Sequence, residues 1–276
     1  MRLSLSVRVA EAPGSKEKTL MSFDELAKLA KRIGYHALCM RASQAGVQTD
    51  QQIIVDIRQT LDDLGLAVSM ITGDFPIPMN NEDGPLALRN IEPYLNLTER
   101  FGASLIRIAM KKQEDIPWAQ RAADQARERS IRLAHQSHTQ SLFETVDGSL
   151  EVLKKINREN FGIIYEPENL DLCGQDYGPE TIKSFEPYLF NVYLQNHILH
   201  PNGRSVANTW TRGNIYFDPI RLQDKGGIDF ELVFEGLKAI GYDGYVTVHQ
   251  AFSEIMKPEE AAQQSYDYFT KIAHFS

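Results

Sequence analysis

IRLAHQSHTQSLFETVDGSLEVLKKI, residues 131–156, contains the structural unit that decides the fold. Its first part, Ile131 to Gln136, is an apolar run typical of a strand, and Asp147 to Ile156 has the apolar spacing of a helix. A polar stretch joins the two parts. The segment therefore predicts one strand followed by one helix, with polar side chains gathered at the end of the strand.

The same strand-and-helix unit recurs along the whole chain. Strands are predicted at residues 3–9, 36–41, 66–72, 104–109, 131–136, 161–166, 190–195 and 245–249. Helices are predicted at residues 23–33, 50–64, 117–129, 147–156 and 229–240, and onward from Pro85, Pro179 and Pro258. Regular alternation requires a parallel sheet with helical crossovers, and eight units favour a closed (β/α)8 TIM barrel.

An open, doubly wound sheet is the alternative for a chain of this pattern. That fold normally carries a glycine-rich turn after its first strand. The corresponding turn reads AEAPGS, residues 10–15, and has no GxGxxG motif. We therefore expect an α/β protein whose residues 1–276 form a single TIM-barrel domain, a length that is ordinary for this fold.

Composition and charge disfavour several classes of function. With 42% hydrophobic residues the chain can bury a large core, and its net charge of -8 disfavours nucleic acid as a partner, although a local basic groove stays open. The first ten residues do not resemble a signal peptide, and no apolar stretch approaches the roughly 18 residues of a membrane span. A cytoplasmic protein without a membrane partner is expected. Cys39 and Cys173 lie far apart with no CxxC, which disfavours a disulfide framework or a thiolate zinc site.

One long connection interrupts the regular alternation. Residues 198–227, ILHPNGRSVANTWTRGNIYFDPIRLQDKGG, contain aromatic, basic and turn residues with little periodicity. Loops of this length in a compact domain are usually lids or binding loops, so Arg204, Trp210 and Arg212 are candidate substrate contacts. The alternative is a solvated excursion packed by Trp210 and Tyr216.

Side chains that can bind metal recur at the predicted ends of four successive strands. They are His138, Glu166, His197 and His249. Strand ends of a TIM barrel meet at one mouth, and imidazole with carboxylate suits a divalent ion such as Mn, Zn, Co, Fe or Ni. Each residue alone is equally compatible with a polar loop that hydrogen-bonds to the backbone. Because side chains alternate along a strand, Gln136 is expected on the same face as His138.

The whole chain resembles the xylose-isomerase-like TIM-barrel proteins, usually labelled sugar phosphate isomerase/epimerase. GGIDFELVFEGLKAIGYDG, residues 226–244, and GYDGYVTVHQAF, residues 241–252, look like the family's last helix and strand. The resemblance implies isomerisation, epimerisation, dehydration or decarboxylation of polyols and keto sugars. It also implies one divalent metal ion held by Glu, Asp, His and Glu from strands five to eight.

This sequence departs from that ligand set at every position that can be matched. LAHQSH, residues 133–138, puts Gln136 where the family has Glu, and EPEN, residues 166–169, puts Glu166 where it has Asp. YLQN, residues 193–196, has Tyr193 in place of the family's His, with His197 just beyond, and His249 replaces the final Glu. The resemblance thus implies Gln136, Glu166, His197 and His249 as the metal ligands of this chain.

The first functional hypothesis is a sugar isomerase or epimerase that acts on the carbon next to a carbonyl of a small carbohydrate. His138, Glu166 and His249 are its candidate catalytic residues. The candidate substrate-binding residues are Arg107, Asn169, Gln195, Arg204 and Trp210. An amide cannot act as a base, so replacing the first glutamate with Gln136 favours a reaction with one base over a symmetrical epimerisation with two.

Two other hypotheses stay open. A lyase of the dehydratase, decarboxylase or keto-glycoside-cleaving type would use the same scaffold on a keto sugar or sugar acid. A sugar-binding barrel without metal or activity would also explain the replaced ligands. No sequence feature fixes the oligomeric state, although barrels of this kind often associate into homo-oligomers.

Overall fold

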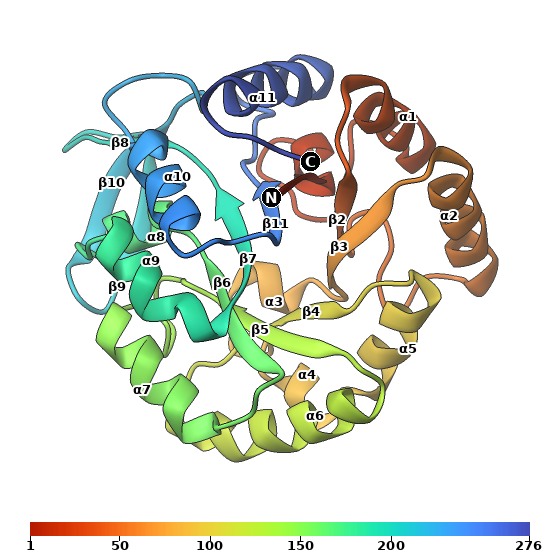
Figure 1. Ribbon diagram of the computed structural model, residues 1–276, viewed down its shortest axis with the longest axis horizontal. Helices are drawn as coiled ribbons and strands as arrows, with labels where there is room; N and C mark the ends of the chain where they lie inside the picture. The colour runs from red at the N-terminus through yellow and green to blue at the C-terminus, as the bar shows by residue number, and fades with distance from the viewer.

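A closed parallel barrel of eight strands forms the centre of the computed structural model, which describes residues 1–276 (Figure 1). The barrel strands are β1 (Arg2–Ser6), β2 (Ala37–Arg41), β3 (Ala67–Thr72), β4 (Leu105–Ile108), β5 (Arg132–Gln136), β6 (Phe161–Tyr165), β7 (Leu189–Leu194) and β11 (Tyr245–Val248). Strand β1 closes the barrel by pairing with β11, with Arg2 opposite Tyr245 and Leu5 opposite Val248. The predicted TIM barrel is confirmed.

Helices surround the barrel on all sides (Figure 1). They are α1 (Phe23–Ile33), α2 (Gln51–Leu64), α5 (Glu92–Arg100), α6 (Ile116–Glu128), α7 (Val146–Ile156), α9 (Pro179–Phe185), α10 (Phe230–Ala239) and α11 (Pro258–Ile272). Helix α1 begins with a capping box of Ser22 and Glu25, and it ends at Gly34, whose φ of 117° only glycine adopts readily. None of the helices is long and apolar enough to cross a bilayer.

Several short elements differ from the sequence-based expectation. The helix expected from Pro85 is divided into α4 (Leu86–Arg89) and α5, because Pro93 lacks an N–H and starts a new helix. The helices α3 (Pro76–Met79) and α8 (Pro167–Leu172) and the 3-10 turns η2 (Gln113–Asp115) and η3 (Glu186–Tyr188) are too short to show periodicity.

The first strand is shorter than the predicted residues 3–9. It ends at Ser6, whose hydroxyl accepts a hydrogen bond from the Arg8 backbone N–H, and the chain then forms the 3-10 turn η1 (Val7–Ala10). Strand alternation stops at this point. Arg8 has the same parity as Ser4 and Ser6, whose side chains face the inside of the barrel, and its side chain lines the mouth.

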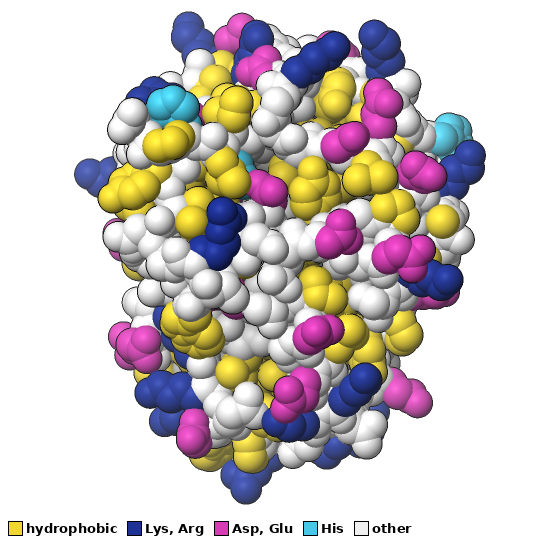
Figure 2. Space-filling model, turned by 90° about the vertical axis from the view of Figure 1, so that its left-hand side faces the viewer, with side chains coloured by type: hydrophobic (Ala, Val, Ile, Leu, Met, Phe, Trp, Pro, Cys, Tyr) yellow, Lys and Arg dark blue, Asp and Glu magenta, His cyan; other side chains and the backbone are white.

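The long connection expected as a loop contains a three-stranded antiparallel sheet. Its strands are β8 (His197–Leu199), β9 (Ser205–Thr209) and β10 (Gly213–Pro219), in the order β8–β10–β9. Figure 2 shows the side of the molecule that carries this sheet, with hydrophobic side chains scattered among charged ones. Both faces of β9 and β10 are largely accessible, so their residues lack the apolar alternation that identifies a half-buried strand.

Two apolar layers stabilise the barrel. The larger core lies between the strands and the surrounding helices. A smaller cluster fills the inside of the barrel and consists of Cys39, Met70, Leu105, Ala134, Ile164 and Tyr193. The hydroxyl of Tyr193 lies 3.3 Å from the sulfur of Cys39, and both cysteines are free thiols. This inner layer is the floor on which the polar side chains of the mouth are built.

Asn196 fastens the connection to the end of β7. Its Nδ2 group donates to the carbonyls of Arg221, Leu222 and Asp224 at 3.0 to 3.3 Å, and its Oδ1 accepts from the Ile228 N–H at 2.8 Å. The Asn196 side chain is buried, and its hydrogen bonds to the Leu222 carbonyl and the Ile228 N–H are shielded from water.

Asn196→Ala is therefore expected to lower the free energy of unfolding by about 2–4 kcal/mol, because it leaves several buried backbone groups unpaired. Urea denaturation measures the change. Asn214→Ala is the matched control, since Asn214 is exposed in β10, and it should change stability by less than about 0.5 kcal/mol. Equal stability of the two variants would contradict the anchoring role of Asn196.

Candidate active site

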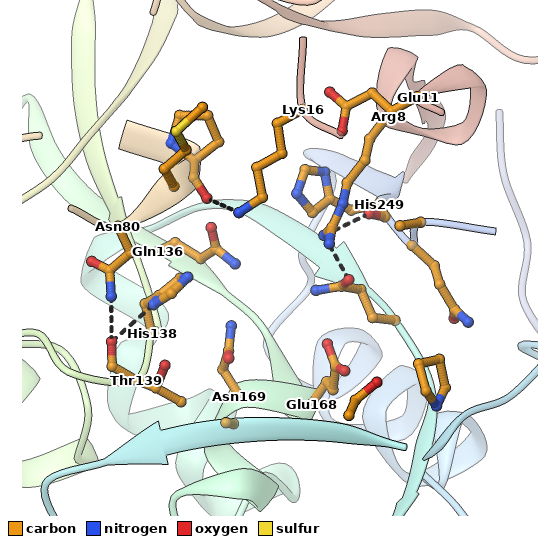
Figure 3. Close-up of a pocket in the computed structure, with 18 of the residues that line it drawn as sticks. Arg8, Glu11, Lys16, Asn80, Gln136, His138, Thr139, Glu168, Asn169 and His249 are labelled. Carbon is orange, nitrogen blue, oxygen red and sulfur yellow. Dashed lines mark hydrogen bonds between the residues drawn. The ribbon is translucent and has the colours of Figure 1, made fainter. Parts of the chain in front are cut away.

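A cavity of about 520 Å³ opens at the carboxyl ends of the barrel strands. Only seven of its 31 lining residues are hydrophobic. Several labelled side chains point into it from different elements in Figure 3, among them Arg8, Gln136, His138, Asn169 and His249. Ligand pockets are usually mostly apolar, so this lining is typical of a site for a small hydroxylated or charged ligand.

A buried carboxylate lies directly behind the cavity wall. The Glu166 side chain is fully buried at the end of β6, and its oxygens accept hydrogen bonds from the amides of Gln136, Asn169 and Gln195. Burial and the nearby charge of Glu168 raise the pKa of Glu166 to about 7. The three amides line the cavity, whereas Glu166 does not. Glu166 therefore orients the amide side chains that face the cavity.

His249 is held as a neutral imidazole at the end of β11. Its ring stacks on Tyr193 with centroids 3.6 Å apart, Nδ1 lies 3.1 Å from the Ser6 hydroxyl, and Nε2 lies 3.4 Å from a nitrogen of Arg41. Burial, followed by the charges of Arg8 and Arg41, keeps the pKa of His249 well below its ordinary value. The imidazole thus accepts a hydrogen bond from Arg41 and is not protonated.

His138 lies on the same face of the β5 end as Gln136, as alternation predicts, and both side chains line the cavity. The His138 Nδ1 is 2.9 Å from the carbonyl of Thr139, which also accepts from Asn80, so Nδ1 carries the proton. Nε2 has no partner in the protein. Burial and the charge of Arg107 lower the pKa of His138 to about 3. His135 points the other way and stacks on Phe143.

His197 is placed among carboxylates at the start of β8. Its Nε2 lies 2.8 Å from Asp171 and its Nδ1 lies 3.3 Å from Glu168. Burial alone would lower the pKa of His197, but these two carboxylates outweigh it and raise the pKa to about 9. His197 is therefore an imidazolium that pairs with α8 and its flanking residues, and it does not line the cavity.

Three cationic side chains of the cavity were not among the site residues chosen from the sequence. They are Arg8, Lys16 and Arg41. Arg41 forms a buried two-point ion pair with Glu11, at 2.7 and 3.3 Å. Arg8 was placed in a strand from the sequence, and Lys16 lies in the loop after it, where no local pattern points to a site. These three side chains come together because the barrel closes and because the loop after β1 folds over its mouth. Neither feature is visible as a motif in the sequence.

The structure does not bring Arg204 and Trp210 into the cavity. Arg204 forms an exposed ion pair with Asp218 at 2.8 Å, and Trp210 is 57% exposed at the turn between β9 and β10. Other parts of the connection do reach the site, because residues 205–208 of β9 form part of the wall. The connection is thus a wall of the cavity, but through residues other than the two chosen from the sequence.

The side chains expected to hold a divalent ion do not fit that role as they are arranged. The two nitrogens of His197 face carboxylates, Nε2 of His249 faces a guanidinium, and the Glu166 oxygens accept from amides. Of the four ligands that the resemblance implies, Gln136 alone has an electron-pair donor atom without a partner, its buried Oε1. No three His, Cys, Asp or Glu side chains converge as a metal site anywhere in the chain. A single amide oxygen beside several cations is a poor site for a divalent ion.

Solved structures share this fold at low sequence identity. The probable 3-DHS dehydratase of Bacillus anthracis has a TM-score of 0.75 and 15% identity, with 98% of this chain and 99% of that chain covered. A xylose isomerase-like TIM barrel protein from Mycobacterium smegmatis, in complex with magnesium, has a TM-score of 0.70 and 16% identity over 98% and 96% of the two chains.

A third similar structure is the D-allulose 3-epimerase from Methylomonas sp. in complex with D-allulose. Its TM-score is 0.66 and its identity 15%, over 99% of this chain and 97% of that one. A comparison with curated protein sequences finds no match. The family model described as xylose isomerase-like TIM barrel matches residues 27–272. This chain therefore belongs to the xylose isomerase-like TIM barrel family.

Proposed function

We propose that the protein is an isomerase or epimerase that moves a proton at the carbon next to a carbonyl of a small hydroxylated compound. The observation that carries the proposal is the unprotonated Nε2 of His138, which has no protein partner in a polar cavity at the barrel mouth. Family membership supports it, since the similar structures include a sugar epimerase.

His138 is the proposed base. Its Nδ1–H is fixed by the Thr139 carbonyl, so Nε2 keeps a lone pair for a substrate C–H. As the proton moves to Nε2, the C–H electron pair forms a double bond to the carbonyl carbon and the carbonyl oxygen becomes an enediolate oxygen. Lys16 in its protonated form is the proposed group that stabilises this oxygen and protonates it, because it lines the same cavity.

The three amides are the proposed hydroxyl-binding groups. Gln136 and Asn169 are held by Glu166, and Gln195 bridges Glu166 to Arg8, from which its Oε1 accepts at 2.7 Å. This chain of hydrogen bonds fixes the orientation of each amide before a substrate arrives. Glu166 acts here as a positioning residue, and the proposed reaction needs no step through a metal ion.

A lyase reaction is the second candidate. Elimination also starts with removal of a proton next to a carbonyl, and it requires a single base, which is what His138 supplies. A probable dehydratase among the similar structures favours this reading. The two reactions differ in product mass, because an isomer keeps the mass of its substrate and a dehydratase product loses water.

The first test follows proton exchange in deuterated water across a panel of ketoses and keto acids. We expect one deuteron to enter the carbon next to the carbonyl, and His138→Gln to slow this exchange by about 10²–10⁴-fold through loss of the base. His200→Gln, at an exposed histidine outside the cavity, is the control with unchanged rate. Full exchange activity in His138→Gln would refute the role of His138, and mass spectrometry of the product separates isomerase from lyase.

The second test is the pH dependence of kcat/KM. Burial and the charges of Arg8, Arg41 and Arg107 lower the pKa of Lys16 to about 7. If protonated Lys16 is required, kcat/KM falls as the pH rises through about 7. Lys16→Arg keeps the charge at all these pH values and should move the fall upward, whereas Lys18→Arg in the same loop should not. An unchanged profile in Lys16→Arg would remove Lys16 from the mechanism.

The third test is removal of divalent ions. Because the donor set does not fit such an ion, dialysis against EDTA should leave both Tm and the rate of proton exchange unchanged. Elemental analysis of untagged protein measures bound Mn, Zn, Co, Fe and Ni directly. A near-stoichiometric ion that is lost in Glu166→Ala or His249→Ala would contradict this prediction and support the ligand set Gln136, Glu166, His197 and His249.

A further inference from the structure

Arg107 is a buried guanidinium without a partner. It lies in β4, its side chain lines the cavity, and the residue is only 4% exposed. It makes no hydrogen bond and no ion pair in the protein, and its Nε is buried without an acceptor. The nearest aromatic contact is the ring of Tyr193, whose centroid is 6.0 Å from the guanidinium carbon. A charge in this position is expensive unless something outside the protein pairs with it.

Arg41 lines the same cavity as Arg107 but has an ion-pair partner. It is buried to the same degree, at 2% exposed, and Glu11 binds it through both carboxylate oxygens. The hydroxyl of Ser43 also donates to Glu11 at 2.9 Å, which holds the carboxylate in place. The chain therefore supplies a buried carboxylate for one of these arginines and none for the other.

Two further cations face the cavity with neutral partners only. Arg8 donates to Gln195 and to the His249 carbonyl, at 2.7 and 3.2 Å, and its Nε is unpaired (Figure 3). Lys16 donates to the carbonyl of Pro78. Neither forms an ion pair. Cationic charge without a counter-charge thus gathers on one cavity.

The carboxylates near the cavity do not neutralise these charges. Glu11 is paired with Arg41, Glu168 lies against the His197 imidazolium, and Glu166 is covered by three amides. Glu254 lines the cavity from an exposed position and forms no ion pair. The charge of Glu166 acts on Arg107 without direct contact, so a ligand is the remaining source of an ion-pair partner for Arg107.

We propose that this cavity binds an oxyanion, a carboxylate or phosphate carried by the ligand, with Arg107 as its buried partner and Arg8 as its second contact. The inference rests on the proposed function in one respect, because it makes the substrate a sugar acid or sugar phosphate instead of a neutral sugar. Guanidinium groups suit this role, since their planar donors bind carboxylate and phosphate oxygens in pairs.

Anion binding would also prepare His138 for its role. After burial, the charge of Arg107 is the main reason that the pKa of His138 is low. An oxyanion on Arg107 offsets that charge, so the imidazole becomes a stronger base when an anionic substrate is bound. A neutral sugar would leave His138 a weak base.

The test measures binding by calorimetry and by the rise in Tm, using three ligands that differ in one group. D-gluconate carries a carboxylate, D-glucitol 6-phosphate carries a phosphate, and D-glucitol carries neither. We expect one or both anions to bind, and to bind at least about tenfold more tightly than D-glucitol, as charge-assisted hydrogen bonds imply. The stronger anion identifies carboxylate or phosphate as the ligand group. Equal response to all three ligands, or to none, would overturn the proposal.

Substitutions show whether Arg107 is the binding group. Arg107→Met should weaken anion binding about tenfold to a hundredfold, and Arg107→Lys, which keeps the charge, should retain part of it. Arg132→Gln is the control, because it also removes one positive charge. Arg132 is exposed at the amino end of β5, on the side of the barrel away from the cavity. Undiminished anion binding in both Arg107 variants would refute the assignment.

The stability of the ligand-free protein gives an independent readout. Since Arg107 is buried without a partner, Arg107→Met should leave the Tm of the free protein unchanged or raise it. A fall in Tm would mean that the guanidinium is structural. These measurements need no turnover. Anion binding without catalysis would refute the proposed enzyme activity and support the anion site. Turnover of neutral sugars without a preference for anions would support the enzyme activity and refute the anion site.

Discussion

The pairing of β1 with β11 is the constraint on which the site depends. It closes the barrel, and it brings Arg8 next to His249, whose carbonyl accepts from the Arg8 guanidinium although the two residues are 241 positions apart in the chain. The same closure aligns the ends of all eight strands at one mouth. Inside the barrel, Tyr193 and its neighbours form an apolar floor, so every polar group above it must find a partner in the mouth or in a ligand.

Partner choice in the mouth follows from charge. The buried Glu166 accepts hydrogen bonds from amide side chains, and Glu11 forms an ion pair with Arg41. His197 pairs with two carboxylates. After these pairings Glu254 is the cavity carboxylate that forms no ion pair, and the Arg107 guanidinium has neither a hydrogen bond nor an ion pair. The side chains expected to bind a metal ion are thus engaged in other pairings, while the fold around them is that of the family.

The fold was predictable from local patterns, and the site only in part. Alternation along β5 correctly placed Gln136 and His138 on one face, and helix α1 spans the predicted residues 23–33. His197 shows the limit, because its strand-end position is visible in the sequence but its pairing with Asp171 and Glu168 is not. The position of Lys16 depends on the course of a loop, which side-chain periodicity does not describe, and Arg8 follows β1 in a 3-10 turn.

The strands β8 and β9 both pair with β10 and not with the barrel, and side-chain links such as Asn196 to Leu222 and Thr211 to Glu144 fasten the connection to the barrel. It forms a wall of the cavity without sharing the barrel's register. Residues of this wall can therefore be replaced, inserted or lost during evolution with little effect on the folding of the strands beneath. Substitutions in this wall can consequently change the shape of the cavity without changing the stability of the barrel.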